Sequence, residues 1–173
     1  MKKKITISLK AFILIGIVFL LLTCRINYVP SESMENTIHE KSFVFSTQIP
    51  YLFNKPQRGD IVIFKSKILN QNCVKRIVGM PGECIEIKNG KVYVDGKFLK
   101  ENYINDWSLD NDGYIFLIPD KHYLVLGDNR DNSEDSRHFE TIARELKTKL
   151  KDDELKMFAY VSENDIKRKV VLY

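Results

Sequence analysis

The sequence predicts a mostly β protein, in which an antiparallel β domain follows a single N-terminal transmembrane helix and one amphipathic helix lies near the C-terminus. Three observations lead to this prediction. An apolar run opens the chain, short segments of strand composition with turn signals between them follow, and one later stretch repeats apolar residues at helical spacing. With 173 residues, the chain has room for one domain of about 150 residues after the N-terminal segment.

The N-terminal run is expected to anchor the chain in a membrane. Residues 1–4 are basic, and residues 5–24 are mostly apolar, interrupted by Lys10 and a few short polar side chains. About 20 such residues span a bilayer core, and Lys10 can reach the headgroups. The lysines predict a cytoplasmic N-terminus and an extracytoplasmic chain after Arg25. The expected units are therefore residues 1–25, a cytoplasmic start and anchor, and residues 26–173, an extracytoplasmic domain.

A cleaved signal peptide is the alternative for this run. Leu21, Leu22, Thr23 and Cys24 resemble a lipoprotein cleavage box, but Thr23 fits poorly where Gly, Ala or Ser is usual. No A-x-A site follows. The uncleaved anchor is therefore the favoured interpretation.

Short strands should build the domain. Turn residues separate them, and Asn89-Gly90 and Asp95-Gly96 are hairpin signals. Trp107 stands alone in a polar stretch, residues 100–112. The predicted strands cover residues 43–49, 61–64, 73–78, 84–87, 91–94, 114–118 and 122–126.

Residues 140–157 are predicted to form one amphipathic helix. Ile142, Ala143, Leu146 and Leu150 recur at helical spacing, with charged residues elsewhere. The expected role is a lid on the edge of the core. Contact with a membrane surface or a partner is the alternative.

Composition excludes several classes of function. The formal net charge of +4 is spread in small patches without a basic stripe, so no nucleic-acid partner is expected. Cys24, Cys73 and Cys84 form neither a zinc pattern nor a disulfide framework. A Cys73–Cys84 bridge is conceivable outside the cytoplasm, and buried free thiols are preferred.

Residues 29–38, VPSESMENTI, can present a nucleophile. Pro30 favours extended geometry before Ser31 and Ser33, although an ordinary polar loop has the same composition. A serine needs a base, and Lys75 lies in an apolar segment, NCVKRIV, where burial can make a lysine neutral. The imidazole alternative is His138, which is expected to lie at the surface or to support the site indirectly.

Four sequence blocks resemble one known family, the type I signal peptidases, which are membrane-bound serine proteases with a serine/lysine dyad. The blocks are PSESMENT, RGDIVIF, KRIVGMPGE and GDNRDNSEDSRHF, at residues 30–37, 58–64, 75–83 and 127–139. With the anchor and the last strand, the resemblance covers most of the chain. Two positions depart from the family pattern: Asn36 stands where Pro is usual, and Glu140 where Gly is usual.

The resemblance implies an antiparallel β catalytic domain of signal-peptidase type with a smaller β-hairpin region at residues 84–112, and it makes the helix at 140–157 an insertion. It also implies roles for individual residues. Ser33 is the nucleophile and Lys75 the general base. The Ser33 N–H and the Ser31 hydroxyl stabilise the oxyanion, and Ser133 orients the lysine. The remaining residues, expected to form a structural ion-pair framework, are Asp128, Asp135 and Arg137.

We therefore expect a monomeric, single-pass enzyme of the cell membrane that removes signal peptides from exported preproteins. Its partners would be signal peptides and the lipid bilayer, with no metal or cofactor. A repressor-type autoprotease would need a DNA-binding domain in place of the anchor, and the sequence contains none. A specialised peptidase and a non-catalytic assembly factor of a pilus or conjugation system stay open, although the latter would be expected to lack the serine or the lysine.

Overall fold

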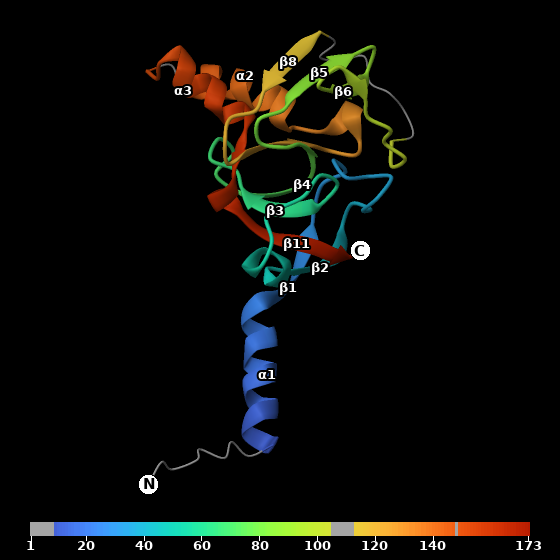
Figure 1. Ribbon diagram of the computed structural model, residues 1–173, viewed down its shortest axis with the longest axis vertical. Coiled ribbons are helices and arrows are strands. Elements are labelled where there is room, and N and C mark those ends of the chain that lie inside the picture. The colour runs from blue at the N-terminus through green and yellow to red at the C-terminus, as the bar shows by residue number, and fades with distance from the viewer. Residues whose placement is uncertain (1–8, 105–112, 148) are drawn as a thin grey trace.

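A seven-stranded antiparallel sheet forms the centre of the computed structural model, which describes residues 9–104, 113–147 and 149–173 (Figure 1). The sheet brings together strands that are far apart in the sequence. Their order is β1 (Cys24–Val29), β2 (Ser42–Thr47), β11 (Ile166–Leu172), β3 (Ile61–Lys65), β4 (Asn72–Gly79), β9 (His122–Leu126) and β10 (Val161–Ser162).

A second antiparallel sheet packs on the β4–β9 part of the first. Within the described residues it has four strands, in the order β7 (Lys97–Phe98), β6 (Lys91–Val94), β5 (Cys84–Lys88) and β8 (Tyr114–Leu117). Val78 and Leu124 of the first sheet share a buried core with Ile85 and Phe116 of the second. This packing fixes β4 and β9, the strands that lead to the polar loops described below.

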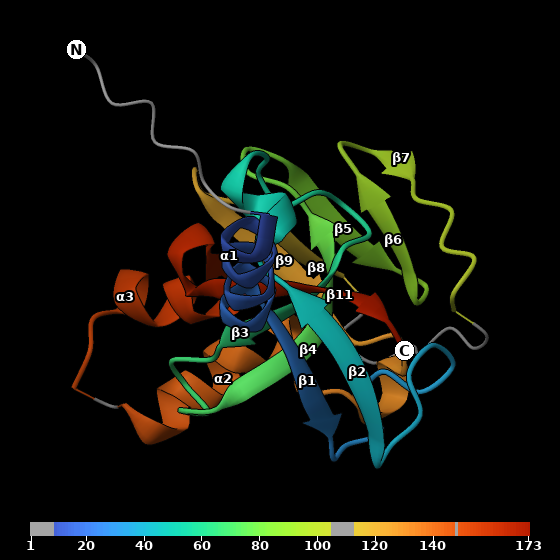
Figure 2. The same ribbon diagram turned by 90° about the horizontal axis from the view of Figure 1, so that it is seen from below.

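The helices lie outside the two sheets. Helix α1 (Leu9–Thr23) projects from the domain in Figure 1. Seen from below in Figure 2, α2 (Ser136–Leu146) and α3 (Asp152–Lys156) lie on one side, and β6 and β7 on the other. Short 3-10 turns complete the structure: η1 (Ile49–Leu52), η2 (Arg130–Asn132), η3 (Met157–Ala159) and η4 (Glu163–Asp165).

The predicted class, mostly antiparallel β with a few helices, is confirmed. Each predicted strand corresponds to an observed one within two residues at either end. The strand predicted at 43–49 ends at Thr47, because η1, with Pro50 in its first turn, follows. Strands β1, β7 and β10 were not predicted. β1 depends on tertiary pairing, since all six of its residues pair with β2.

The single helix predicted at 140–157 is wrong, because two helices occupy this stretch. α2 begins earlier, at Ser136, where the side chain of Asp135 caps it. It ends at Leu146, which is 67% exposed and so does not extend the buried face. α3 then starts separately, with acidic residues in its first turn and Glu154 accepting a hydrogen bond from the Lys151 N–H.

Two further expectations are only partly met. Of the apolar run at 5–24, residues 9–23 form α1, and residues 5–8 and Trp107 lie outside the described residues. Across the ranges that the structure describes, no helix has both the length and the apolarity that crossing a membrane needs. The structure contradicts a Cys73–Cys84 bridge, since all three cysteines are free. The preferred alternative, buried free thiols, holds fully only for Cys73, because Cys24 and Cys84 are partly exposed.

Candidate active site

The loop after β1 presents Ser33 from a fixed turn. The Ile38 N–H donates to the Met34 carbonyl at 2.8 Å, and the side chains of both residues are buried. Asn36 in this turn has φ +84°, a left-handed conformation that Asn tolerates and that Pro, fixed near −65°, cannot adopt. The departure from proline at this position therefore matches the backbone of the loop.

Lys75 reaches Ser33 from β4. Its backbone pairs with Val62 of β3, and only 5% of the residue is exposed. Its Nζ donates to the Ser33 Oγ at 2.6 Å, in buried surroundings. Burial lowers the pKa of the Lys75 amine, and the nearby Asp135 opposes this effect only in part. The structure thus joins the two residues that the sequence singled out.

The two other predicted serines lie beside this pair. The Ser31 Oγ is 3.4 Å from the Ser33 Oγ. The Ser133 Oγ donates to the Asp135 Oδ2 at 2.7 Å, and Ser133 is 95% buried at the wall of the same cleft as Lys75.

Asp135 is a buried junction in the loop that follows β9. It accepts hydrogen bonds from the Ser133 hydroxyl, from the Gly127 N–H at 2.9 Å and from the Arg137 guanidinium at 2.9 and 3.0 Å. Burial alone would raise the pKa of the Asp135 carboxyl, but Arg137 and these hydrogen bonds outweigh burial and hold the pKa below its ordinary value. Asp135 is therefore a charged centre that orders the loop.

Asp128 has a partner that the sequence analysis missed. The Arg76 Nε and Nη2 donate to its two carboxylate oxygens at 2.9 and 2.6 Å, and the guanidinium lies 3.9 Å above the Tyr103 ring. A second missed pair joins Arg130 to Glu101 at 2.6 Å, with both side chains buried. Arg76 is next to Lys75 in the KRIVGMPGE block, and this position could have indicated a role in the site. Glu101 lies in a polar stretch where no motif indicates such a role.

Gly127 brings the two polar loops together. A Cβ at this position would lie 2.2 Å from the Ser133 Oγ and 2.4 Å from the Ser33 carbonyl oxygen. The neighbouring Asn129 N–H donates to that same carbonyl at 3.1 Å. The absence of a side chain at Gly127 therefore lets the Ser33 and Ser133 loops pack in contact.

Ser33 and Lys75 line an open cleft of about 1010 Å³. Apolar side chains of β1, β3, β4 and α2 line it together with polar ones such as Asn27, Asn72 and Thr141, and the loops that carry Ser33 and Ser133 also contribute to the lining. His138 also lines the cleft, and Lys75 donates a hydrogen bond to the Ser33 hydroxyl. A serine hydroxyl held against a buried lysine amine is an arrangement that can supply a nucleophile together with its base.

Comparison with known proteins agrees with this chemistry. A protein-family model described as "Signal peptidase, peptidase S26" matches residues 2–148. The chain belongs to this family. The predicted enzyme class, a signal peptidase that removes signal peptides from exported proteins, is thereby confirmed.

Individual relatives show how far the similarity extends. The chain is 35% identical to signal peptidase I of Leptolyngbya laminosa, over 81% of this chain and 71% of that protein. It is 34% identical to signal peptidase I S of Bacillus subtilis strain 168, over 79% of this chain and 81% of that protein. For the probable signal peptidase I-2 of Synechocystis, the identity is 41% over 68% of this chain and 56% of that protein. A solved signal peptidase I from Enterococcus faecalis V583 matches with a TM-score of 0.50 and 28% identity, over 68% of this chain and 97% of that one.

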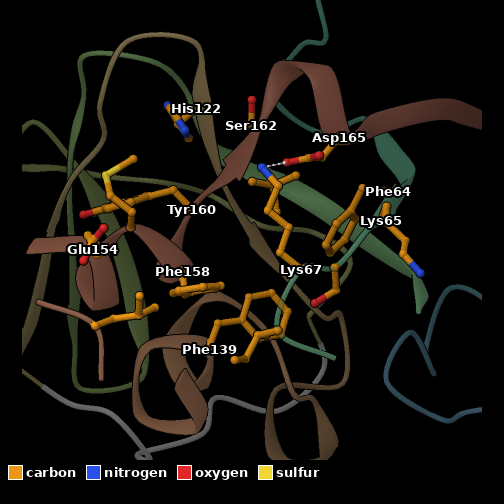
Figure 3. A pocket seen from close by; sticks show the side chains of 15 residues that line it. Phe64, Lys65, Lys67, His122, Phe139, Glu154, Phe158, Tyr160, Ser162 and Asp165 are labelled. Atoms are coloured by element: carbon orange, nitrogen blue, oxygen red, sulfur yellow. Dashed lines mark ion pairs between the residues drawn. The ribbon is translucent and has the colours of Figure 1, made fainter. Parts of the chain in front are cut away.

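A second cavity of about 400 Å³ lies apart from the Ser33–Lys75 pair in this signal peptidase (Figure 3). Phe139, Phe158 and Tyr160 line it, and Lys67 forms an ion pair with Asp165 across it at 2.6 Å. Part of its wall comes from beyond residue 148, where the family match ends. Helix α2 lines both the second cavity, through Phe139, and the cleft that contains Ser33 and Lys75, through His138.

Replacing Gly127 by Ala should separate the two loops. We expect Gly127→Ala to lower kcat/KM for a peptide substrate at least about 100-fold, the cost of misplacing reacting groups by about 1 Å. The matched control is Gly16→Ala, where a Cβ meets nothing within 4 Å and activity should be unchanged. Steady-state kinetics of both variants, with thermal unfolding to check the fold, would test this, and normal turnover in Gly127→Ala would contradict the packing argument.

Asp135→Asn should destabilise the fold by about 3–5 kcal/mol at pH 7, because it leaves the buried Arg137 charge unpaired. Since the folded-state pKa of Asp135 is lowered, its charge stabilises the fold above the unfolded value near 3.9, and this contribution is lost as the pH falls further. The difference between wild type and variant in the free energy of unfolding, measured with urea, should therefore be smaller at pH 3 than at pH 7. The exposed Asp153→Asn is the control, and a difference independent of pH would refute the assignment.

Proposed function

We propose that this chain removes signal peptides by acyl transfer to Ser33, with Lys75 as the general base, while anchored in the cell membrane by its N-terminal helix. The observation that carries the mechanism is the 2.6 Å hydrogen bond between the Lys75 Nζ and the Ser33 Oγ, both buried. A lysine whose pKa is lowered by burial can be neutral near pH 7, as a base must be.

Each step moves one proton through Lys75. The neutral amine takes the hydroxyl proton while the Ser33 Oγ bonds to the scissile carbonyl carbon. The resulting ammonium gives that proton to the nitrogen of the departing chain as the peptide bond breaks. Water then hydrolyses the ester, with Lys75 as base again, and frees the signal peptide and Ser33.

The oxyanion formed on the carbonyl needs hydrogen-bond donors. The Ser33 N–H and the Ser31 hydroxyl, which lies 3.4 Å from the Ser33 Oγ, are the proposed donors. Removing one such donor typically costs about 2.7–4 kcal/mol of transition-state stabilisation.

Ser133 is the proposed orienting residue for the lysine. Its hydroxyl donates its one proton to Asp135, so its lone pairs are left to accept a hydrogen bond from the Lys75 amine. Asp128 and Arg76, and likewise Asp135 and Arg137, would hold the loops in place without taking part in proton transfer.

The cleft suits an extended apolar segment. Its apolar lining includes Val29, Ile63, Leu69, Val74 and Ile142. A signal peptide that enters in extended form would place alternate side chains on this lining and its carbonyl groups toward the serine loop.

Membrane attachment is supported by apolar surface that continues from the helix into the domain. The large apolar side chains of α1 are 45–75% exposed, and α1 passes directly into β1. Ile26, Tyr28 and Phe43 of the β1–β2 pair are 71%, 51% and 68% exposed. A bilayer would cover these groups, with the basic N-terminus cytoplasmic, the catalytic domain outside and the enzyme acting as a monomer.

A non-catalytic assembly factor is the weaker candidate. A chain that had only kept the fold would not need a buried lysine against a serine hydroxyl, because burying an amine costs stability. The retained Ser33–Lys75 contact therefore favours an active peptidase.

Lys75→Arg should lower kcat/KM by about a thousandfold or more, like Ser33→Ala, because a guanidinium cannot release its proton near pH 7. In the wild type, kcat/KM should rise from pH 5 to pH 8, since the neutral fraction of an amine with a lowered pKa grows with pH. Cleavage of a preprotein after an A-x-A site is the assay, and the exposed Lys88→Arg is the control. Near-normal turnover of Lys75→Arg, with loss in His138→Ala, would make the imidazole the base.

Deletion of residues 1–22 should release the enzyme from membranes and leave cleavage of a short peptide within a few-fold of the full chain. The deletion keeps Thr23, whose carbonyl accepts from the Gln48 N–H, and the whole of β1. Co-sedimentation with phospholipid vesicles and peptide kinetics are the measurements. A longer deletion, residues 1–29, removes β1 and should fail to fold. Persistent vesicle binding by the shorter deletion would show that the anchor lies elsewhere.

A further inference from the structure

The mouth of the catalytic cleft carries three carboxylates. Glu32 precedes Ser33 directly, Asp131 lies in η2, and Glu134 follows Ser133 directly. All three line the cleft and are exposed. We call Glu32, Asp131 and Glu134 the acidic rim.

No cation of the described residues forms an ion pair with the acidic rim. Among the residues that the structure describes, no ion pair involves any of the three carboxylates. Within the described lining of the cleft, Lys75 is the only lysine or arginine, and it is buried against Ser33. The chain as a whole has a formal charge of +4, so the negative rim is a local feature of the cleft.

The rim lies where substrate residues next to the scissile bond must pass. Its members come from the two loops that carry Ser33 and Ser133, which are held together by hydrogen bonds from Asn129 to the Ser33 and Glu32 carbonyls at 3.1 and 3.2 Å. The strands β1, β3 and β4 and helix α2 contribute apolar side chains and uncharged polar ones such as Asn27 and Asn72, but no carboxylate. The negative charge of the described cleft lining is therefore confined to the loops around Ser33.

From this arrangement, and resting on the proposed function, we infer that the acidic rim selects preproteins with a lysine or arginine within two residues of the scissile bond and disfavours acidic residues there. The attraction is electrostatic and acts on binding and on the transition state alike. The three carboxylates would act on a substrate side chain from several ångströms away, near the protein surface. At such distances we expect kcat/KM to be about tenfold higher for a substrate with a positive side chain than for one with a negative side chain.

The test uses a neutral peptide with an A-x-A site that the full chain cleaves. Copies of this peptide carry one Lys or one Glu at the middle residue of the A-x-A site or at either of the two residues after the scissile bond. At low salt, kcat/KM for the Lys copy should exceed that for the Glu copy about tenfold at one position or more. Raising the ionic strength to about 1 M, where the Debye length is about 3 Å, should bring this ratio close to one. A ratio of one or below at every position would overturn the inference.

Isosteric variants identify the rim as the cause. In the triple variant Glu32→Gln, Asp131→Asn, Glu134→Gln, the Lys-to-Glu ratio should fall toward one. The matched control, Glu86→Gln, Glu145→Gln, Asp153→Asn, changes the net charge equally at residues outside the cleft lining and should keep the ratio. Equal loss in both variants would assign the preference to net charge and overturn the inference. Thermal unfolding checks the fold, and Glu32→Gln alone is the fallback if the triple variant is unstable.

The neutral peptide separates this inference from the proposed function. If Ser33→Ala cleaves it as well as the wild type does, the serine/lysine mechanism is wrong, and the inferred charge preference, which rests on that mechanism, is wrong as well. If it is cleaved in a Ser33-dependent way but charge has no effect, only the inference is wrong.

Discussion

The hydrogen bond between Lys75 and Ser33 is the contact on which the rest of the site depends. A lysine amine serves as a base only if it is kept from being charged, and burial does this at a cost in stability. A carboxylate nearby would normally restore the charge. Asp135 is such a carboxylate, but Arg137 binds it through two hydrogen bonds and counteracts part of its effect on the pKa of Lys75. The Asp135–Arg137 pair thus orders the loop, while burial keeps the pKa of Lys75 below its ordinary value.

One strand serves both sides of the catalytic loop. Lys75 and Arg76 are neighbours on β4, so their side chains point to opposite faces of the sheet. Lys75 meets Ser33 on one face, and Arg76 holds Asp128, at the start of the loop, on the other. Any shift of β4 would therefore disturb the nucleophile and the loop together. Pairing along both edges, with β3 and with β9, restrains β4 against such a shift.

Local signals predicted most of the fold and the central pair, and long-range contacts account for what was missed. Strand alternation and turn residues located β4 and β9, and the sequence blocks located Ser33 and Lys75. Strand β1 was missed because it follows an apolar helix without a break and is defined only by its pairing with β2. The Arg130–Glu101 pair joins residues 29 positions apart and has no sequence signal on the Glu101 side.

The wrong bounds of the predicted C-terminal helix have a local cause instead, since a helical period does not fix where a helix begins or ends. Asp135 decides the beginning, because the carboxylate that holds Ser133 also caps α2. Glu140 then matters, since the glycine usual in this family would cost about 1 kcal/mol in a helix interior relative to alanine. Glu140 instead pairs with Arg144 one turn later and supports a helix that runs to Leu146. The catalytic loop therefore leads directly into α2, whose Phe139 forms part of the second cavity.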